Sequence, residues 1–141
     1  MNRIAIGSLI IGFVAVLVLL VLSLSARGDD LKDINWLAED INSGGVIDNA
    51  QTTLMVNADG SVTGSGGCNR FMSNASIDGS KITFNPTVAT RMMCAPALMD
   101  QEQKFFSALE QARSYAIDAP TGKLLLHDEA GKVVARLARQ D

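Results

Sequence analysis

The residues of this chain that could carry chemistry are two cysteines, one histidine and a short methionine cluster. In thiol enzymes the thiolate is the nucleophile, and it needs a base such as histidine within hydrogen-bonding reach. Cys68 or Cys94 could therefore pair with His127. Sulfur ligands also suit Cu(I), so the cysteines could bind that metal together with Met92 and Met93. The spacing of these residues favours neither arrangement.

Other motifs for catalysis or cofactor binding are absent from the sequence. It contains no nucleophile elbow, no phosphate loop and no zinc-ligand spacing. Gly64-Ser-Gly-Gly67 lacks the Lys-Ser/Thr ending of a phosphate loop, and its glycines instead suit a sharp turn before Cys68. The carboxylates are scattered along turns, as a solvated surface requires. The sequence therefore predicts no catalytic residue, no metal ligand set and no cofactor.

A long uncharged segment follows the positively charged N-terminus. Ile4–Leu24 spans 21 residues, and Arg3 precedes it while Asp29 lies beyond it. At about 1.5 Å per residue, a helix of this length crosses a hydrocarbon core of ~30 Å. The charge asymmetry favours a cytoplasmic N-terminus. The small residues of Ser23-Leu-Ser25 also fit a signal peptide cleaved after them, so both forms remain open and the length favours an uncleaved anchor.

The chain accordingly divides into residues 1–26 as signal anchor or signal peptide, 27–34 as a polar linker, and 35–141 as one domain. Arg3 is the single charged residue before Arg27, so the exported part has 11 Lys+Arg against 15 Asp+Glu, a net charge of −4. This balance gives no support for nucleic-acid binding, which needs a basic face. We expect contact with the inner membrane through residues 4–24 and a domain in the periplasm, or release into the periplasm after cleavage.

Export has a consequence for the cysteines. In an oxidising compartment, a pair of cysteines usually forms a structural disulfide. We therefore expect Cys68 and Cys94 to be joined, which removes the nucleophile and the soft metal ligands together. A bridge between positions 26 apart contributes about 3.5 kcal/mol by the loop-entropy estimate. Titration of free thiols in the exported protein separates this interpretation from the thiol-dependent and metal-handling ones.

Turn signals at short intervals divide the exported part into short segments with strand character. Two loops that end in glycine, residues 57–60 and 128–131, fit hairpins. Such short connections require antiparallel neighbours, because a parallel return needs a long crossover. The expected strands are Asn35–Asp40, Thr52–Val56, Ser61–Ser65, Ala75–Ile77, Lys81–Phe84, Ser114–Ile117, Lys123–His127 and Val133–Leu137.

One segment has helical periodicity instead. Asp100 and Gln103 fit a capping box, in which each side chain satisfies a backbone amide at the start of a helix. The inner face that follows at helical spacing consists of Glu102, Phe105, Phe106, Leu109 and Ala112. Glu102 is its one polar member. The sequence thus predicts an α+β fold, with one amphipathic helix of about three turns attached by its phenylalanines to an antiparallel sheet.

Two short motifs are distinctive when taken together. They are Gly66-Gly-Cys-Asn-Arg-Phe71 and Thr90-Arg-Met-Met-Cys94, with Gly66, Gly67, Asn69, Phe71, Thr90, Met92 and Met93 as motif positions beside the cysteines. They resemble the META domain, also called HslJ-like. Further matching positions are Trp36-Leu37, Gln103, Phe105-Phe106, Leu109, Leu124-Leu-Leu126 and Gly131. The resemblance covers about Asn35 to Ala138.

The resemblance implies a compact, antiparallel β-rich domain with one helix, found on bacterial envelope proteins that are often lipid-anchored. This chain has no lipid-acceptor cysteine behind the apolar segment, so its anchor is the N-terminal helix or nothing. The family is associated with heat-inducible expression and novobiocin resistance in one branch, and with motility and virulence in a protozoan branch. It supplies no established catalytic residues.

The sequence and the resemblance together predict a non-catalytic envelope module. Its role would be structural, or it would bind an unknown protein or a small hydrophobic ligand, in stress tolerance or in novobiocin-type antibiotic tolerance. The alternative is a metal-handling or thiol-dependent protein that uses the cysteines, the methionines and the histidine named above.

The charge asymmetry around residues 4–24 makes a testable prediction about topology. A reporter that is active only outside the cytoplasm, fused after Asp141, should be active, because Arg3 holds the N-terminus in the cytoplasm. The same fusion to a reporter that works only inside the cytoplasm should be silent. The opposite pattern would show that the orientation is wrong.

Overall fold

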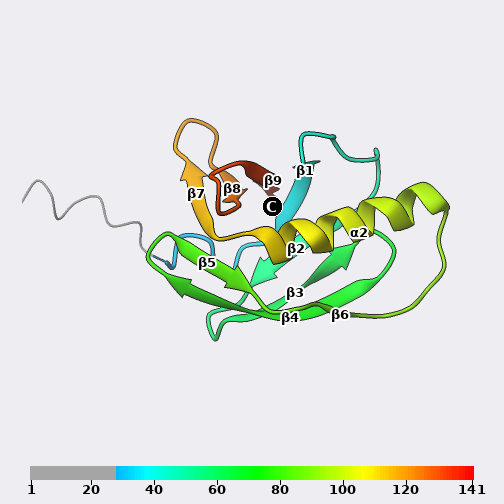
Figure 1. Ribbon diagram of the computed structural model, residues 1–141, viewed down its shortest axis with the longest axis horizontal. Coiled ribbons are helices and arrows are strands. Elements are labelled where there is room, and N and C mark those ends of the chain that lie inside the picture. The colour runs from blue at the N-terminus through cyan, green and yellow to red at the C-terminus, as the bar shows by residue number, and fades with distance from the viewer. Residues whose placement is uncertain (1–27) are drawn as a thin grey trace, which may run out of the picture.

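Short strands joined by tight turns make up most of residues 28–141, the part of the chain that the computed structural model describes (Figure 1). The predicted anchor or signal segment, residues 1–26, lies outside these residues. Within the described part, no helix has both the length and the apolar character needed to cross a membrane. The strands are β1 (Trp36–Ile41), β2 (Thr52–Val56), β3 (Ser61–Gly66), β4 (Arg70–Asp78), β5 (Lys81–Phe84), β6 (Val88–Ala89), β7 (Ser114–Asp118), β8 (Lys123–His127) and β9 (Val133–Arg139); the helix is α2 (Pro96–Gln111).

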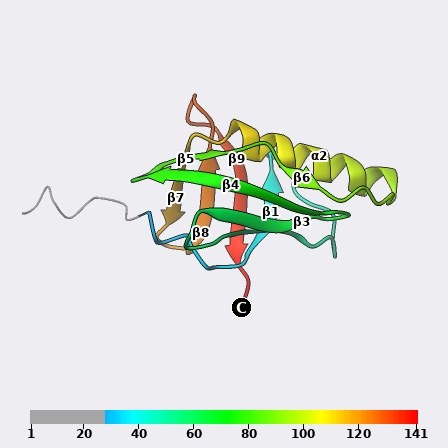
Figure 2. The same ribbon diagram turned by 90° about the horizontal axis from the view of Figure 1, so that it is seen from below.

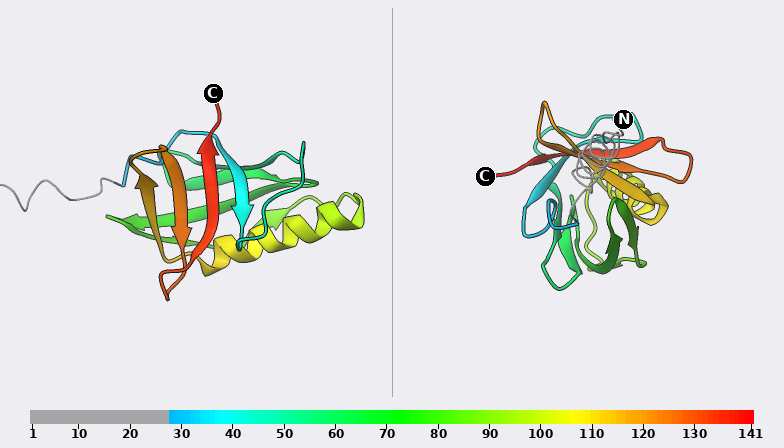
Figure 3. Two further views of the ribbon diagram at one scale, coloured as in Figure 1. Left: turned by 90° about the horizontal axis from the view of Figure 1, so that it is seen from above. Right: turned by 90° about the vertical axis from the view of Figure 1, so that its left-hand side faces the viewer.

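The strands form one antiparallel sheet that closes on itself. Their order is β3-β2-β1-β9-β8-β7-β5-β4-β6, and a further pairing of β3 with β4 completes a ring of eight strands with β6 added to β4 (Figures 1 and 3). The pairing between β5 and β7 is the shortest in the ring, with one register pair, Lys81 with Ser114. There the amide of Ile82 donates to Arg113 O at 3.1 Å, and the amide of Tyr115 donates to Ser80 O at 2.9 Å.

The interior of the barrel is filled by side chains from most strands, and in several of them buried and more exposed positions alternate. In β8, for example, Leu124 and Leu126 are fully buried while their neighbours are partly exposed. Trp36 is also fully buried, and its Nε1 donates to Leu31 O at 3.0 Å, which satisfies the one polar atom of its ring. This period of two places one face of each strand in the core. The core is therefore aliphatic, with a few aromatic rings set among the leucines.

The α+β class, the antiparallel sheet and the two glycine-ended hairpins are confirmed. Gly60 and Gly131 have φ of 86° and 81°, which a residue with a Cβ rarely adopts. The bounds of most predicted strands agree with the structure to within two residues, and two strands differ more. β4 begins at Arg70, five residues before the expected Ala75. Its first half was not predicted, because the buried Ser73 interrupts the apolar alternation. The short strand β6 was not predicted, because two residues carry no detectable period.

The predicted helix exists, but its predicted capping box is wrong. α2 begins at Pro96, after the N-cap residue Ala95, which makes no side-chain capping bond. Proline suits this position because its missing N–H would have had no helical partner. Asp100 therefore lies inside the helix, where its carboxylate pairs with Lys104 at 2.7 Å. The helix has 16 residues, which gives it more than four turns and a length of about 24 Å.

The helix packs along one side of the barrel through its apolar face. It contacts β9, β3, β5 and β1 (Figures 2 and 3). Phe105 and Phe106 approach the ring of Phe71 edge to face, with centroids 6.0 and 5.2 Å away. This geometry suits the electron-poor edge and electron-rich face of aromatic rings. The phenylalanines thus attach the helix to the sheet, as the sequence predicts, and the strand that they contact is β4.

The segment before β1, predicted to be a polar linker, is held against the barrel. Leu31 is fully buried, and the amide of Asp33 donates to Val56 O at 2.8 Å. Lys32 also forms an isolated bridge with Val56. The folded unit therefore includes residues that precede the first strand.

The burial pattern of α2 predicts which substitutions destabilise the domain. Phe105→Ala or Leu109→Ala should cost about 2–5 kcal/mol of unfolding free energy, because each removes a fully buried side chain and leaves a cavity. Gln111→Ala should stay within roughly 0.5 kcal/mol, because Gln111 is exposed. Urea unfolding of the three variants measures this. Equal losses in all three would mean that the apolar face is misassigned.

Candidate functional site

The two distinctive motifs meet at one end of the barrel. The first forms the turn between β3 and β4, and the second forms the segment that leads from β6 to α2. Cys68 and Cys94 are joined by a disulfide, with their Cα atoms 6.0 Å apart. This is the pairing expected for the two cysteines of an exported chain. The bridge fastens the β3–β4 turn to the residues just before the helix.

A buried carboxylate lies at the centre of this junction. Glu102 is 1% exposed and reaches from the inner face of α2 to the β3–β4 turn. Its Oε2 accepts from the amides of Asn69 at 2.6 Å and Cys68 at 3.2 Å, and its Oε1 accepts from Asn69 Nδ2 at 2.7 Å. No cation within residues 28–141 forms an ion pair with it. Burying a carboxylate is costly, and here three N–H donors offset that cost.

Asn69 connects this carboxylate to the second motif. Its Oδ1 accepts from the amide of Met92 at 2.7 Å and from Thr90 Oγ1 at 2.9 Å, while its Nδ2 donates to Glu102. Both ends of the amide group are thereby used. The side chain fixes the distance between the β3–β4 turn, the helix and the loop before the helix.

The glycines of the first motif make room for this arrangement. A Cβ on Gly66 would collide with the Cγ and Oε2 atoms of Glu102. Gly67 has a φ of 114°, which side chains with a Cβ rarely adopt. A Cβ there would also lie 3.0 Å from Leu98 Cδ1. Both glycines are therefore required by the close approach of the turn to the helix.

The remaining motif positions separate into a buried and an exposed group. Phe71 is 2% exposed and belongs to the core beneath the helix. Met92 and Met93 are 57% and 88% exposed, so they lie outside the core. Within the described residues, every buried side-chain nitrogen and oxygen has a hydrogen-bond partner. The two motifs thus form a structural junction whose buried polar side chains are all hydrogen-bonded, and two exposed apolar side chains lie at its edge.

The candidate thiol and metal ligands are not brought together. Cys94 precedes the N-terminus of α2, whereas His127 O accepts from the amide of Arg113, just beyond its C-terminus, at 2.7 Å. The helix between them is about 24 Å long. Within residues 28–141, no group of three or more histidine, cysteine, aspartate or glutamate side chains is placed to hold a metal ion.

Two side chains outside the junction have shifted pKa values. Burial raises the pKa of the Tyr115 phenol, and the negative charges of Asp30 and Asp29 raise it further. Hydrogen bonds from the side chain and amide of Ser61 lower the pKa of Asp59, in the β2–β3 hairpin. Tyr115 lies on β7 and Asp59 in a surface loop, so neither contributes to the motif junction.

A groove of about 570 Å³ borders the junction. Its walls are β6 with the loop that follows it, and one stripe of α2; Figure 2 shows these two elements beside each other. Its lining residues are Asn69, Thr87, Val88, Ala89, Thr90, Arg91, Met92, Met93, Met99, Glu102, Gln103, Phe106 and Glu110. The exposed methionines of the second motif therefore belong to a concave surface.

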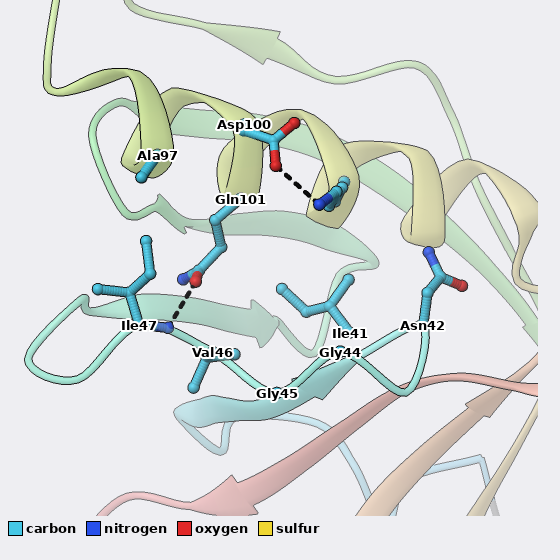
Figure 4. Close-up of a pocket in the computed structure, with 10 residues that line it drawn as sticks. Ile41, Asn42, Gly44, Gly45, Val46, Ile47, Ala97, Asp100 and Gln101 are labelled. Carbon is cyan, nitrogen blue, oxygen red and sulfur yellow. Dashed lines mark hydrogen bonds and ion pairs between the residues drawn. The ribbon is translucent and has the colours of Figure 1, made fainter.

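A second pocket, of about 440 Å³, lies on the other side of the helix, under the β1–β2 loop (Figure 4). Gln101 closes its floor: its Oε1 accepts from the amide of Ile47 at 2.7 Å, and its Nε2 donates to Thr52 Oγ1 at 3.0 Å. Asp100 and Lys104 pair with each other on its rim. The Gln101 side chain therefore holds the β1–β2 loop to the helix.

The role of Glu102 was not predicted from the sequence. The signal was present, because Glu102 is the one polar residue on the inner face of the helix, and a buried carboxylate needs donors. The donors themselves could not be found, because they are backbone amides 33 and 34 residues away. The groove was missed for the same reason, since β6 and α2 meet only in the folded chain.

The fold and junction define a small antiparallel barrel with one covering helix, attached to it through a buried carboxylate. Comparison with known families gives the assignment: the sequence matches the META domain over residues 29–141, and the chain belongs to that family. No curated protein matches it.

Three solved structures share the fold. One, described as an NMR structure of a protein, has 22% identity and a TM-score of 0.63, and the match covers 79% of this chain and 93% of that one. A protein from Burkholderia xenovorans has 23% identity and a TM-score of 0.61, with 78% and 83% covered. A duf4847 family protein from Bacteroides vulgatus has 19% identity and a TM-score of 0.55, with 86% and 99% covered.

The geometry of Glu102 predicts a graded loss of stability. Glu102→Ala should lower the unfolding free energy by about 3 kcal/mol or more, because buried N–H donors lose their acceptor. Glu102→Gln should lose less, because its amide oxygen still accepts while its NH₂ group faces the NH₂ group of Asn69. Denaturant unfolding checks this order, with the exposed Glu110→Ala as control. Equal stability of Glu102→Ala and the control would show that the carboxylate is dispensable.

Proposed function

We propose that this chain is a non-catalytic module of the bacterial cell envelope. Residues 4–24 hold it in the inner membrane, or direct its release into the periplasm, and the barrel acts outside the cytoplasm. Its role is in binding or structural support during stress, including heat and novobiocin-type antibiotics. Membership of the META domain family supports the envelope assignment.

One observation carries the non-catalytic part of this proposal. The side chains of the junction that could take part in chemistry are bonded to one another or to the backbone. Cys68 and Cys94 form a disulfide, so neither has a free thiol. Both oxygens of Glu102 accept hydrogen bonds, and both ends of the Asn69 amide are engaged. General acid–base catalysis needs titratable groups that converge on a substrate. The groups of this junction converge on the backbone instead.

The alternative, a metal-handling or thiol-dependent protein, has less support. It needs the cysteines, Met92, Met93 and His127 in one site, whereas the histidine lies near the opposite end of α2. The disulfide also removes the thiolates that would attack a substrate or bind Cu(I). The exposed methionines point instead to a surface that contacts a partner, since methionine adapts to varied apolar surfaces.

Deletion of the gene should lower tolerance to heat or novobiocin, and the wild-type chain should restore it. His127→Ala should restore tolerance fully, because His127 takes no part in the junction. Cys68→Ala/Cys94→Ala should restore it only to the extent that folded, exported protein remains, which immunoblotting of the envelope fraction measures. If His127→Ala abolished tolerance while the protein stayed folded and exported, the non-catalytic proposal would be wrong.

A further inference from the structure

The groove beside the motif junction has a strand edge as one wall. β6 is the last strand in the sheet order, so β4 is its neighbour on one side and no strand lies on the other. The other side faces α2 across the groove. The edge of a sheet presents unpaired N–H and C=O groups, which can form hydrogen bonds with an extended peptide.

The register of β6 shows which backbone groups are available. The amide of Thr90 donates to Arg70 O at 3.0 Å, and Ala89 lies opposite Phe71 in the antiparallel ladder. Hydrogen-bonded and non-hydrogen-bonded pairs alternate in such a ladder, so the N–H and C=O of Ala89 point away from β4. No residue of the described part of the chain bonds to them. Ala89 therefore offers one donor and one acceptor to the groove.

The side chains around this edge are unusually apolar for a surface. Four of the five exposed large hydrophobic residues in the described part lie here: Met72, Val88, Met92 and Met93. Met72 and Val88 are cross-strand partners, so their side chains project from the same face of the sheet. Three of them, Val88, Met92 and Met93, line the same groove, and such a cluster of exposed apolar side chains is typical of a binding site.

The two ends of the groove carry opposite charges. Arg91 follows β6 at the end nearest the start of α2, and Glu110 lies in the last turn of the helix. Both are exposed, and neither side chain forms an ion pair or a hydrogen bond within residues 28–141. The five extended residues from Thr87 to Arg91 span about 13 Å. The twelve helical residues from Met99 to Glu110 span about 17 Å, so the groove accommodates about five extended residues.

We propose that this groove binds an extended peptide segment of a partner protein, which adds to β6 as an antiparallel strand. This inference rests on the proposed binding role of the module. The segment carries an acidic residue at its N-terminal end, which pairs with Arg91, and a basic residue about four positions later, which pairs with Glu110. Apolar side chains between them contact Met92, Met93 and Phe106. Its backbone bonds to Ala89, as in other cases of strand addition.

The antiparallel orientation follows from the sheet and from the charges. Each pairing between the named strands is antiparallel, and antiparallel ladders are slightly more stable per residue than parallel ones. A segment antiparallel to β6 has its N-terminal end beside Arg91. The order of charges in the partner, acidic before basic, is therefore fixed by the direction in which it binds.

Selection of random heptapeptides displayed on phage against the full chain in detergent micelles tests this proposal. The wild-type chain should enrich peptides with an acidic residue about four positions before a basic one. Arg91→Glu/Glu110→Lys should enrich the reversed order, basic before acidic. Asp100→Lys/Lys104→Glu is the matched control, because it exchanges an exposed charge pair on the same helix that lines the other pocket. It should select the wild-type order.

A second variant tests the role of the backbone. Ala89→Pro removes the N–H that faces the groove and leaves the bonds between β6 and β4 in place, so it should weaken binding of a selected peptide at least tenfold in fluorescence anisotropy. Retention of the disulfide and an unchanged circular dichroism spectrum would show that it is folded. Unchanged affinity in folded Ala89→Pro would overturn strand addition.

The selection has outcomes that overturn the proposal outright. No enriched motif, or the same charge order from wild type and from Arg91→Glu/Glu110→Lys, would show that the groove does not bind such a segment. These results would not touch the proposed envelope role, which the deletion phenotype tests separately. Conversely, a deletion without phenotype alongside a charge-dependent peptide motif would leave the groove established and the stress role wrong.

Discussion

The structure depends most on the burial of one carboxylate, that of Glu102, beneath the β3–β4 turn. A carboxylate can be 1% exposed only if donors replace its water, and the amides of Cys68 and Asn69 with the Asn69 side chain are those donors. The helix, the turn and the loop before the helix must therefore be assembled together. The remaining features of the motifs follow from this requirement.

The same constraint explains why the motif combines glycines, an asparagine and a disulfide. Gly66 leaves space for the carboxyl group, and Asn69 passes the connection on to Met92. The disulfide fastens the same two segments covalently. These bonds hold the residues after β6 beside the helix, and there Met92 and Met93 are exposed next to the free edge of β6. The structural junction and the groove with the free strand edge therefore lie side by side.

Much of the fold could be predicted because its signals are local. Glycines at positive φ mark the hairpins at residues 60 and 131, and alternation of buried and exposed positions marks most strands. Predictions were less accurate where local signals were weak or were overruled. The buried Ser73 interrupted the alternation of β4, and it is tolerated there because its hydroxyl donates to Asn85 O at 2.6 Å. The helix starts at Pro96, and no capping side chain marks this position.

The sequence by itself determined the antiparallel α+β class, the apolar face of the helix, the family resemblance and the pairing of the two cysteines. These depend on residue type and on spacing within a few positions, or on a count of two thiols. Only the tertiary structure decided that the sheet closes into a barrel, that Glu102 meets the amides of Cys68 and Asn69, and that β6 faces α2 across a groove. The physical reason is that every residue except proline has the same backbone N–H group, so a sequence does not distinguish one backbone donor from another. Which of them a distant carboxylate or a free strand edge will face is fixed only when the whole chain has packed.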